Sequence, residues 1–240
     1  MLEEVLAQSV PNHVAMIMDG NRRFAEKLGL NPIEGHALGR DKLEEVLDWC
    51  LELGIKIVTV YAFSTENIKR SADELKALLE LFMESFRKAG DDKRVHKNKV
   101  KIKAIGRVDI LPKEVQDAIK YAEERTKEYD NYHLNIAIAY GGREEIVQAV
   151  KRIANDVKNG KLSEQLINEE TISSYLYTKD LPDPDLILRT SGEERISNFL
   201  LWQIAYSELY FADVYWPELR KIDFLRAIRA YQHRRRRFGE

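Results

Sequence analysis

The sequence has little cysteine, no long apolar run and no excess of charge of either sign. Its single cysteine, Cys50, excludes a disulfide framework and a cysteine-based metal site. The net charge of −2 gives no whole-chain reason to expect nucleic-acid binding. No apolar run approaches the ~20 residues that cross a bilayer, and no secretory signal precedes the first apolar segment. We therefore expect a cytoplasmic protein that does not bind nucleic acid.

Two common phosphate-binding motifs are also absent. No G-x-G-x-x-G follows the first apolar segment, and G-x-x-x-x-G-K-[ST] occurs nowhere in the 240 residues. These absences argue against dinucleotide-binding and P-loop enzymes. Any phosphate chemistry must therefore rest on side chains.

Strand-like and helix-like segments alternate along the chain. Alternation of this kind predicts an α/β fold: a single domain over residues 1–240, with a central, mainly parallel sheet of about six strands surrounded by helices. No repeat or long linker divides the chain. The predicted strands are His13–Asp19, Ile55–Ser64, Val100–Gly106, His133–Tyr140, Leu186–Thr190 and Asp213–Tyr215.

Two predicted helices carry wide apolar faces, over Leu43–Leu51 and Leu75–Phe86. Gly54 stands where a left-handed cap would end the first helix, and Ser71 with Glu74 forms a capping signature before the second. Apolar faces of this width more often belong to an ordinary core than to a channel. Further helices are predicted at Lys113–Glu128, Arg143–Val157, Glu169–Tyr177 and Phe224–Arg237.

The first predicted strand runs directly into a polar cluster that opens a helix. Free backbone N–H groups and the helix dipole favour an anion at such a place. The acid alone would be interpreted as a helix N-cap, but the arginines beside it favour a binding site. The cluster consists of Asp19, Gly20, Asn21, Arg22 and Arg23.

Polar residues follow two further predicted strands. Because the carboxyl ends of parallel strands meet at the ligand-binding edge of an open α/β sheet, we expect these residues to come together. His36 and Glu208 complete the set, the latter in an apolar stretch where an acid needs a partner or a metal. The strand-end residues are Ser64, Glu66, Asn67, Arg70, Arg189, Ser191, Arg195 and Ser197.

Arginines with hydroxyl and amide donors suit the oxygens of a diphosphate, and an acid among them suits a bridging Mg²⁺. Each arginine alone could equally form a surface ion pair worth about 0–1 kcal/mol. His36 could be an ordinary histidine, and Glu208 could belong to a buried ion pair. Together the residues favour a diphosphate site, although they leave a phosphohydrolase open.

Several segments, in order, resemble the cis-prenyltransferases, the family of undecaprenyl and dehydrodolichyl diphosphate synthases. The resemblance runs from about His13 to Gly239, nearly the whole chain. The segments read HVAMIMDGNRR (13–23), YAFSTEN (61–67) with Arg70, LNIAIAYGGR (134–143), LRTSGE (188–193), RISNFLLWQ (195–203) and ELYF (208–211).

The resemblance implies a homodimeric, Mg²⁺-dependent enzyme. It would add isopentenyl diphosphate repeatedly to farnesyl or geranylgeranyl diphosphate, making each new double bond cis. The product would be a long-chain polyprenyl diphosphate, a precursor of glycosyl carrier lipid. The growing chain would occupy an apolar tunnel walled by the two apolar helix faces, and the greasy product would bring peripheral membrane contact.

Site residues carry over position by position. Asp19 would hold Mg²⁺ and assist departure of the allylic diphosphate, with Glu208 as a second metal-associated acid. Asn67 would be the proton acceptor or an orienting amide. The carboxyl-terminal Arg-x-Gly element would reach into the partner subunit's site. The substrate-binding positions would be Gly20, Asn21, Arg22, Arg23, Phe24, His36, Ser64, Thr65, Glu66, Arg70, Arg189, Arg195, Ile196, Ser197, Arg237 and Gly239.

The chain departs from the family pattern at Pro32, where many relatives have an arginine that grips the allylic diphosphate. Arg22 or Arg40 could substitute for it. Phe24 and Ile68 stand where bacterial members often carry tryptophan. Together with Thr-Ser-Gly-Glu after Arg189, these residues resemble archaeal or eukaryotic members, so both acceptors stay open.

The alternative interpretation is a non-catalytic subunit of a heteromeric prenyltransferase. Asp19 and Asn67 argue against it. The trans-prenyltransferases do not fit, because they are all-helical and carry Asp-rich D-D-x-x-D motifs, whereas the adjacent acids Asp91 and Asp92 lack a third.

Overall fold

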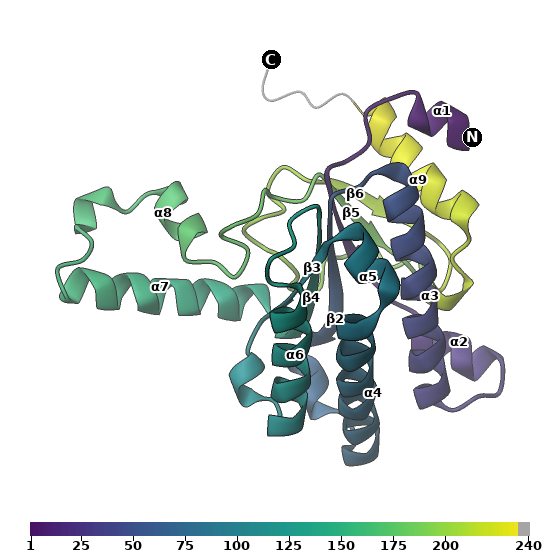
Figure 1. Ribbon diagram of the computed structural model, residues 1–240, viewed down its shortest axis with the longest axis horizontal. Coiled ribbons are helices and arrows are strands. Elements are labelled where there is room, and N and C mark those ends of the chain that lie inside the picture. Colours follow the sequence, from purple (N-terminus) through teal and green to yellow (C-terminus); the bar gives the residue numbers. More distant parts are fainter. Residues whose placement is uncertain (235–240) are drawn as a thin grey trace.

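The computed structural model describes residues 1–234, and of residues 68 and 69 the backbone only. A six-stranded, all-parallel sheet in the order β3-β4-β2-β1-β5-β6 forms its centre (Figure 1). The predicted α/β fold is confirmed. The strands are β1 (His13–Ile17), β2 (Ile57–Ser64), β3 (Val100–Ile105), β4 (Tyr132–Tyr140), β5 (Leu186–Arg189) and β6 (Glu208–Phe211).

The sixth strand lies earlier than its prediction at Asp213–Tyr215, which is wrong. The segment that pairs with β5 runs from Glu208, opposite Leu186, to Phe211, opposite Arg189. Both segments are short and aromatic, so the sequence pattern does not separate them. Backbone bonds do: the Val214 carbonyl accepts the amide of Ser191, which ties the 213–215 segment to a turn.

Nine α-helices accompany the sheet in residues 1–234. Asn31 and Glu34 form a capping box around Pro32, whose fixed φ suits the first position of a helix. The Ser71 side chain accepts the amide of Glu74, as the capping signature predicts. The helices are α1 (Leu2–Leu6), α2 (Asn21–Lys27), α3 (Pro32–Leu53), α4 (Ala72–Asp91), α5 (Lys93–Asn98), α6 (Lys113–Thr126), α7 (Gly142–Lys158), α8 (Glu169–Ser174) and α9 (Lys221–His233).

Both faces of the sheet are covered. Alternate residues of a strand point to opposite faces, and β1 divides accordingly. Val14 and Met16 pack with side chains of α3 and α9, whereas Ala15 and Ile17 pack with the 199–200 segment. Because both faces of β1 are buried, its sequence is a continuous apolar run without alternating polar residues.

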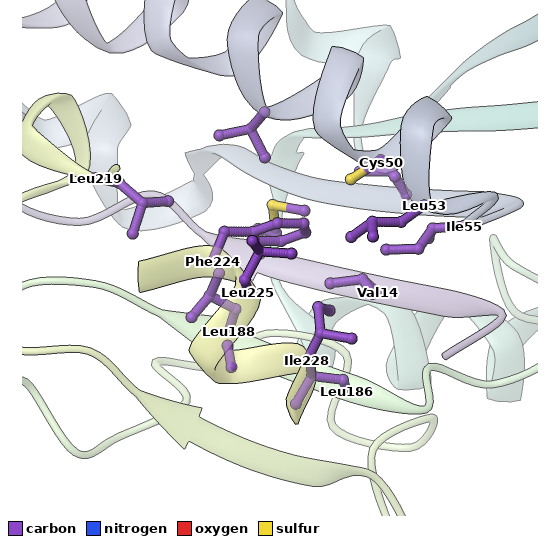
Figure 2. Close-up of a cluster of buried hydrophobic side chains, with 14 of the residues drawn as sticks. Val14, Cys50, Leu53, Ile55, Leu186, Leu188, Leu219, Phe224, Leu225 and Ile228 are labelled. Carbon is purple, nitrogen blue, oxygen red and sulfur yellow. The ribbon is translucent and has the colours of Figure 1, made fainter. Parts of the chain in front are cut away.

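The largest apolar cluster lies between the sheet, α3 and α9. Figure 2 shows side chains of Val14, Cys50, Leu186 and Ile228 within it. Cys50 is buried, and burial raises the pKa of its thiol, as suits a small core residue. A second cluster packs α4 and α6 against β2, β3 and β4.

Helices α7 and α8 project from the body as an arm (Figure 1). The arm is fixed at its base by Glu145, which is fully buried and accepts the amide of Tyr177 at 2.7 Å and Nε2 of Gln203 at 3.1 Å. Among residues 1–234, no helix combines the length and the apolar character needed to span a bilayer.

Candidate active site

Asp19 lies just beyond the carboxyl end of β1, at the turn into α2. The turn needs glycine at position 20, because φ there is +106° and a Cβ would lie 2.7 Å from the ring of Tyr215. The Asp19 backbone is held by Thr190, whose hydroxyl donates to the Asp19 carbonyl at 2.7 Å. Asp19 is therefore fixed against the end of β5.

Two arginines bind the Asp19 carboxylate. Arg189 Nη2 donates to Oδ2 at 2.8 Å, and Arg23 Nη2 lies 3.2 Å from Oδ1. Burial raises the pKa of Asp19, but the hydrogen bond and charge of Arg189 and the charge of Arg23 outweigh it and lower the pKa. Asp19 is thus an anion at neutral pH.

Arg189 is 3% exposed, and its guanidinium is held on three sides. Besides Asp19, it donates to the hydroxyl of Ser197 at 2.7 Å and to the backbone carbonyl of Arg195. Its Nε and the Oδ1 of Asn21 are buried without a hydrogen-bond partner among the described residues. Buried unpaired polar groups are rare and costly, so these two atoms suggest a polar ligand at this edge of the sheet.

Arg23 extends this network to the turn after β5. It donates to the hydroxyl of Ser191 at 2.6 Å and to Glu193 at 3.1 Å, and Glu193 also pairs with Arg195. Alternating charges thus run from Arg189 through Asp19 to Arg195 and preorganise the donors.

A second charged cluster is centred on Glu74 of α4. Its carboxylate pairs with Arg70, lies 3.8 Å from Nε of Arg22 and 3.4 Å from Nε2 of His36. Burial and then the charge of Arg70 lower the pKa of His36, so that its ring is neutral at pH 7. Burial raises the pKa of Glu74, but Arg70 outweighs burial and lowers it.

These clusters border a polar cavity of about 330 Å³. Seven of the predicted site residues line it, so the expectation that the first polar cluster, His36 and Arg70 come together is met. The lining is Met18, Asp19, Gly20, Asn21, Arg22, Arg23, Glu26, His36 and Arg70.

An apolar cavity of about 210 Å³ adjoins the polar one and lies between α3, α4 and the sheet. The two share Met18, Asn21 and His36 in their linings. The apolar cavity extends to Val100 and Tyr132, near the other edge of the sheet. Both apolar helix faces border this cavity, because Leu43, Leu47, Leu51, Leu78, Phe82 and Phe86 all line it.

The loop after β2 is locked by its own side chains. Asn67 Oδ1 accepts the amide of Ser64 at 2.9 Å, and the Ser64 hydroxyl accepts the amide of Asn67 at 3.3 Å. The Thr65 hydroxyl donates to Glu66 at 3.2 Å. This loop lies at the same edge of the sheet as Asp19.

Other predicted residues lie apart from the polar cavity. Glu208 begins β6 level with Val14, at the amino edge of the sheet, and pairs with Arg234 at 2.9 Å. Within one chain, Glu208 and Asp19 are therefore not brought together. Phe24 and Ile196 are half-buried. Arg237 and Gly239 lie outside the described residues.

The structure separates the two arginines proposed to replace the residue lost at Pro32. Arg22 lines the polar cavity, whereas Arg40 pairs with Asp41 at 2.8 Å and lines the apolar one. Arg22 is therefore better placed to contact a diphosphate.

Three contributors were missed at the level of sequence: Glu74, Glu193 and Asn198. Glu74 had only a capping role in the sequence pattern, although its spacing of four residues from Arg70 is that of a helical ion pair. Glu193 and Asn198 lie within the family-like segments 188–193 and 195–203, but the sequence gave neither of them a role. Their partners come from distant segments that only the fold brings close.

The donor set fits Mg²⁺ only with help from a substrate. No group of three or more His, Cys, Asp or Glu side chains suited to a metal occurs among the described residues. Mg²⁺ commonly binds through one or two carboxylates plus substrate phosphates and water. The ionised Asp19 carboxylate, 29% exposed and lining the polar cavity, meets that requirement.

Comparisons with known proteins agree with this geometry. The family model described as "Putative undecaprenyl diphosphate synthase" matches residues 17–239. A geranylgeranyl-diphosphate-specific tritrans,polycis-undecaprenyl-diphosphate synthase of Methanopyrus kandleri is 60% identical over 99% of this chain and 88% of its own length. A protein of the same name from Picrophilus torridus is 58% identical over 100% of this chain and 94% of its own length.

Two solved structures share the fold. Lavandulyl diphosphate synthase from Lavandula x intermedia, in complex with dimethylallyl diphosphate, is 37% identical with a TM-score of 0.90 over 99% of this chain and 100% of that one. A probable undecaprenyl diphosphate synthase from Campylobacter jejuni is 37% identical with a TM-score of 0.78, over 97% and 100%. The chain belongs to the cis-prenyltransferase family of undecaprenyl diphosphate synthases. It is accordingly a prenyltransferase that makes a polyprenyl diphosphate.

Proposed function

We propose that this enzyme adds isopentenyl diphosphate repeatedly to geranylgeranyl diphosphate, giving a long-chain cis-polyprenyl diphosphate that serves as precursor of a glycosyl carrier lipid. The observation that best supports the proposal is that the polar and apolar cavities meet at Met18, Asn21 and His36. A diphosphate in the polar cavity would find space for its hydrocarbon chain in the apolar one. The specificity named for the archaeal relatives supports geranylgeranyl over farnesyl diphosphate.

The two diphosphates would occupy neighbouring sites. The turn at Gly20, Arg22 and Arg23 would hold the allylic diphosphate, with His36 and Arg70 at the rim. The isopentenyl diphosphate would bind to Arg195, to Ser197 and to Arg189, whose buried Nε has no partner among residues 1–234. Because contacts within the protein already fix Arg189, it would need little reorganisation to stabilise negative charge.

In the reaction, the allylic C–O bond breaks, a C–C bond to isopentenyl diphosphate forms, and a proton leaves the new unit. Asp19 would orient the departing diphosphate through Arg23 and Arg189. Asn67 would orient the substrate or receive the proton. Its carbonyl oxygen is already used by Ser64, so the local bond fixes its direction.

Asp19 would hold Mg²⁺ together with substrate oxygens. The metal would supply positive charge that neutralises the leaving diphosphate. Glu208 stays a predicted metal-associated acid; because it lies at the other edge in its own chain, that role would require a partner's site.

We propose further that residues 1–240 form one domain and that the enzyme is a homodimer in which Arg237 and Gly239 complete the partner's site. Exposed apolar side chains on the arm, including Val147, Val150 and Leu166, support a protein contact there. The apolar product supports peripheral contact with a membrane.

One incubation tests the proposal. Purified protein receives labelled isopentenyl diphosphate with dimethylallyl, farnesyl or geranylgeranyl diphosphate, with and without Mg²⁺, and products are resolved by length. We expect long, Mg²⁺-dependent products made best from geranylgeranyl diphosphate. A single condensation with dimethylallyl diphosphate would contradict it. No incorporation by a folded protein would instead favour a non-catalytic subunit.

A further inference from the structure

The segment from Ile196 to Leu200 has an unusual backbone. Ser197, Asn198 and Leu200 have φ values of +48°, +63° and +45°. Residues other than glycine seldom adopt this left-handed region, and asparagine tolerates it better than most. Such conformations persist only where surrounding contacts impose them, and they gather at functional sites. The contacts around this segment therefore bear on Ser197.

Asn198 makes three hydrogen bonds, two with the start of α7 and one with the loop after β2. Its Oδ1 accepts the backbone amide of Arg143 at 2.9 Å, and its backbone carbonyl accepts the amide of Gly142 at 2.7 Å. Its Nδ2 donates to Oε1 of Glu66 at 3.3 Å. One side chain thus joins the start of α7 to the loop after β2.

The glycines at the start of α7 let this side chain approach. A Cβ on Gly141 would lie 2.9 Å from Asn198 Nδ2, and a Cβ on Gly142 would lie 2.7 Å from Cγ of Leu201. The turn is therefore shaped around the 198–201 segment. A plain capping role for α7 would account for the bond to Arg143, but not for the bond to Glu66.

The neighbours of Asn198 and Glu66 in sequence are site residues. Ser197 precedes Asn198 and accepts a hydrogen bond from Arg189, whereas Asn67 follows Glu66 and is locked to Ser64. A bond from Asn198 to Glu66 consequently sets the distance between the two loops that carry Ser197 and Asn67.

We propose that Asn198 is a positioning residue that holds the isopentenyl-binding segment in register with the loop of Asn67. Asparagine suits the task because one amide accepts from Arg143 and donates to Glu66 at the same time, in a left-handed conformation. Aspartate would keep the acceptor but would place a carboxylate against Glu66. The proposal rests on the proposed function, since it assumes isopentenyl diphosphate at Ser197.

A swap of donor and acceptor tests it. Asn198→Asp removes the donor, and adding Glu66→Gln restores a donor on the other side. Glu66→Gln alone keeps an acceptor oxygen and serves as the reference for loss of charge. Asn198→Gly keeps the left-handed backbone and removes the amide. For each variant, KM for isopentenyl diphosphate, KM for the allylic substrate, kcat and the unfolding midpoint are measured.

We expect Asn198→Asp and Asn198→Gly to raise KM for isopentenyl diphosphate about tenfold, as for loss of a hydrogen bond to a charged group, with KM for the allylic substrate little changed. Adding Glu66→Gln to Asn198→Asp should bring KM back to that of Glu66→Gln alone. A double variant as impaired as Asn198→Asp would overturn the proposal. So would losses that follow the unfolding midpoint, because a purely structural role predicts them.

Failure of the proposed function is seen separately. If the wild-type protein incorporates no isopentenyl diphosphate, the proposed function fails. The positioning role is then decided by calorimetric binding of isopentenyl diphosphate to the same variants. An unchanged affinity in Asn198→Asp would overturn it.

Discussion

Two clusters of polar residues, one at each edge of the sheet, differ in how completely their members are paired. At the amino edge, Asp185 accepts the backbone amides of Asn12 and His13 at 2.7 and 2.9 Å, and Glu208 pairs with Arg234. At the carboxyl edge, Arg189 Nε and Asn21 Oδ1 are buried without a partner among the described residues.

This difference teaches where binding capacity resides. A polar cluster whose donors and acceptors are all used stabilises the fold, whereas one with unused buried groups is costly unless something else binds it. The apolar cavity runs from the carboxyl edge of the sheet towards the amino edge. Under the proposed function, the carboxyl edge would receive the charged head of the substrate and the apolar cavity its hydrocarbon tail.

The largest contrast is expected between two aspartates, one at each edge. Asp19→Asn should lower kcat at least about 100-fold, because charge on the leaving group loses preorganised stabilisation. Asp185→Asn should leave kcat near wild type but lower the unfolding midpoint, because two backbone amides lose a charged acceptor. Steady-state kinetics and thermal unfolding of both variants check this. Equal kinetic losses in both would remove the distinction between the edges.

The sequence predicted the carboxyl edge better than the amino edge. Alternating elements and polar strand ends sufficed to gather Asp19, Arg22, His36 and Arg70, because parallel strands leave little freedom in where their ends lie. Glu208 was different: its partner Arg234 is 26 residues away, and its position depends on which short segment pairs with β5.

Other features depend on burial, which a pattern does not specify. Glu74 reaches Arg22 and His36 only because α4 lies beside α3, whereas its pair with Arg70 is local. The Nε of Arg189 is left without a partner in the described part of the chain because Asp19, Ser197 and the Arg195 carbonyl bind the other two nitrogens of its buried guanidinium. Residues that reach across the fold in this way carry no local signature.

The length of the product tests the path between the edges. Leu78 and Phe82 of α4 line the apolar cavity, whereas Val115 lies in the same apolar cluster without lining it. Leu78→Trp should shorten the product and Phe82→Ala should lengthen it, while Val115→Ala should leave it unchanged. Chromatography of labelled products gives the readout. An unchanged length in both cavity variants would assign this face to packing alone.

A smaller effect on length is expected where the cavity nears the amino edge. Arg94 of α5 binds Glu44 at 2.9 Å and Asp48 at 3.0 Å on α3, and all three residues line the cavity. Because these pairs tie α5 to α3, Arg94→Ala should allow somewhat longer products, and high salt should shift the wild type in the same direction. Lys221→Ala, which removes an ion pair with Glu52 that does not line the cavity, is the matched control. Equal products from both variants and at both salt concentrations would refute a role for the pairs.

The smallest effect on activity, but a clear one on stability, is expected from His13. Its Nδ1 donates to the carbonyl of Pro182 at 2.8 Å and its Nε2 accepts from the hydroxyl of Thr59 at 2.7 Å, so the neutral ring satisfies both bonds. Burial lowers its pKa to about 4, against the smaller opposing influences of the Pro182 carbonyl and of Asp185. The unfolded chain, with a pKa of 6.5, therefore binds a proton between pH 6.5 and 4 that the folded chain does not.

Stability from this group is therefore complete above pH 6.5 and declines as the pH falls to about 4, by an amount on the order of 3 kcal/mol. His13→Gln should lose that decline, while its kcat at pH 7 stays near wild type, because His13 lies at the amino edge, away from Asp19, and both of its ring nitrogens are bonded within the fold. The difference between the two denaturation curves, taken at several pH values, isolates His13 from other titrating groups. Parallel pH profiles would mean that the proton enters the folded core without cost, and the contrast between a paired and an unpaired edge would then no longer hold at His13.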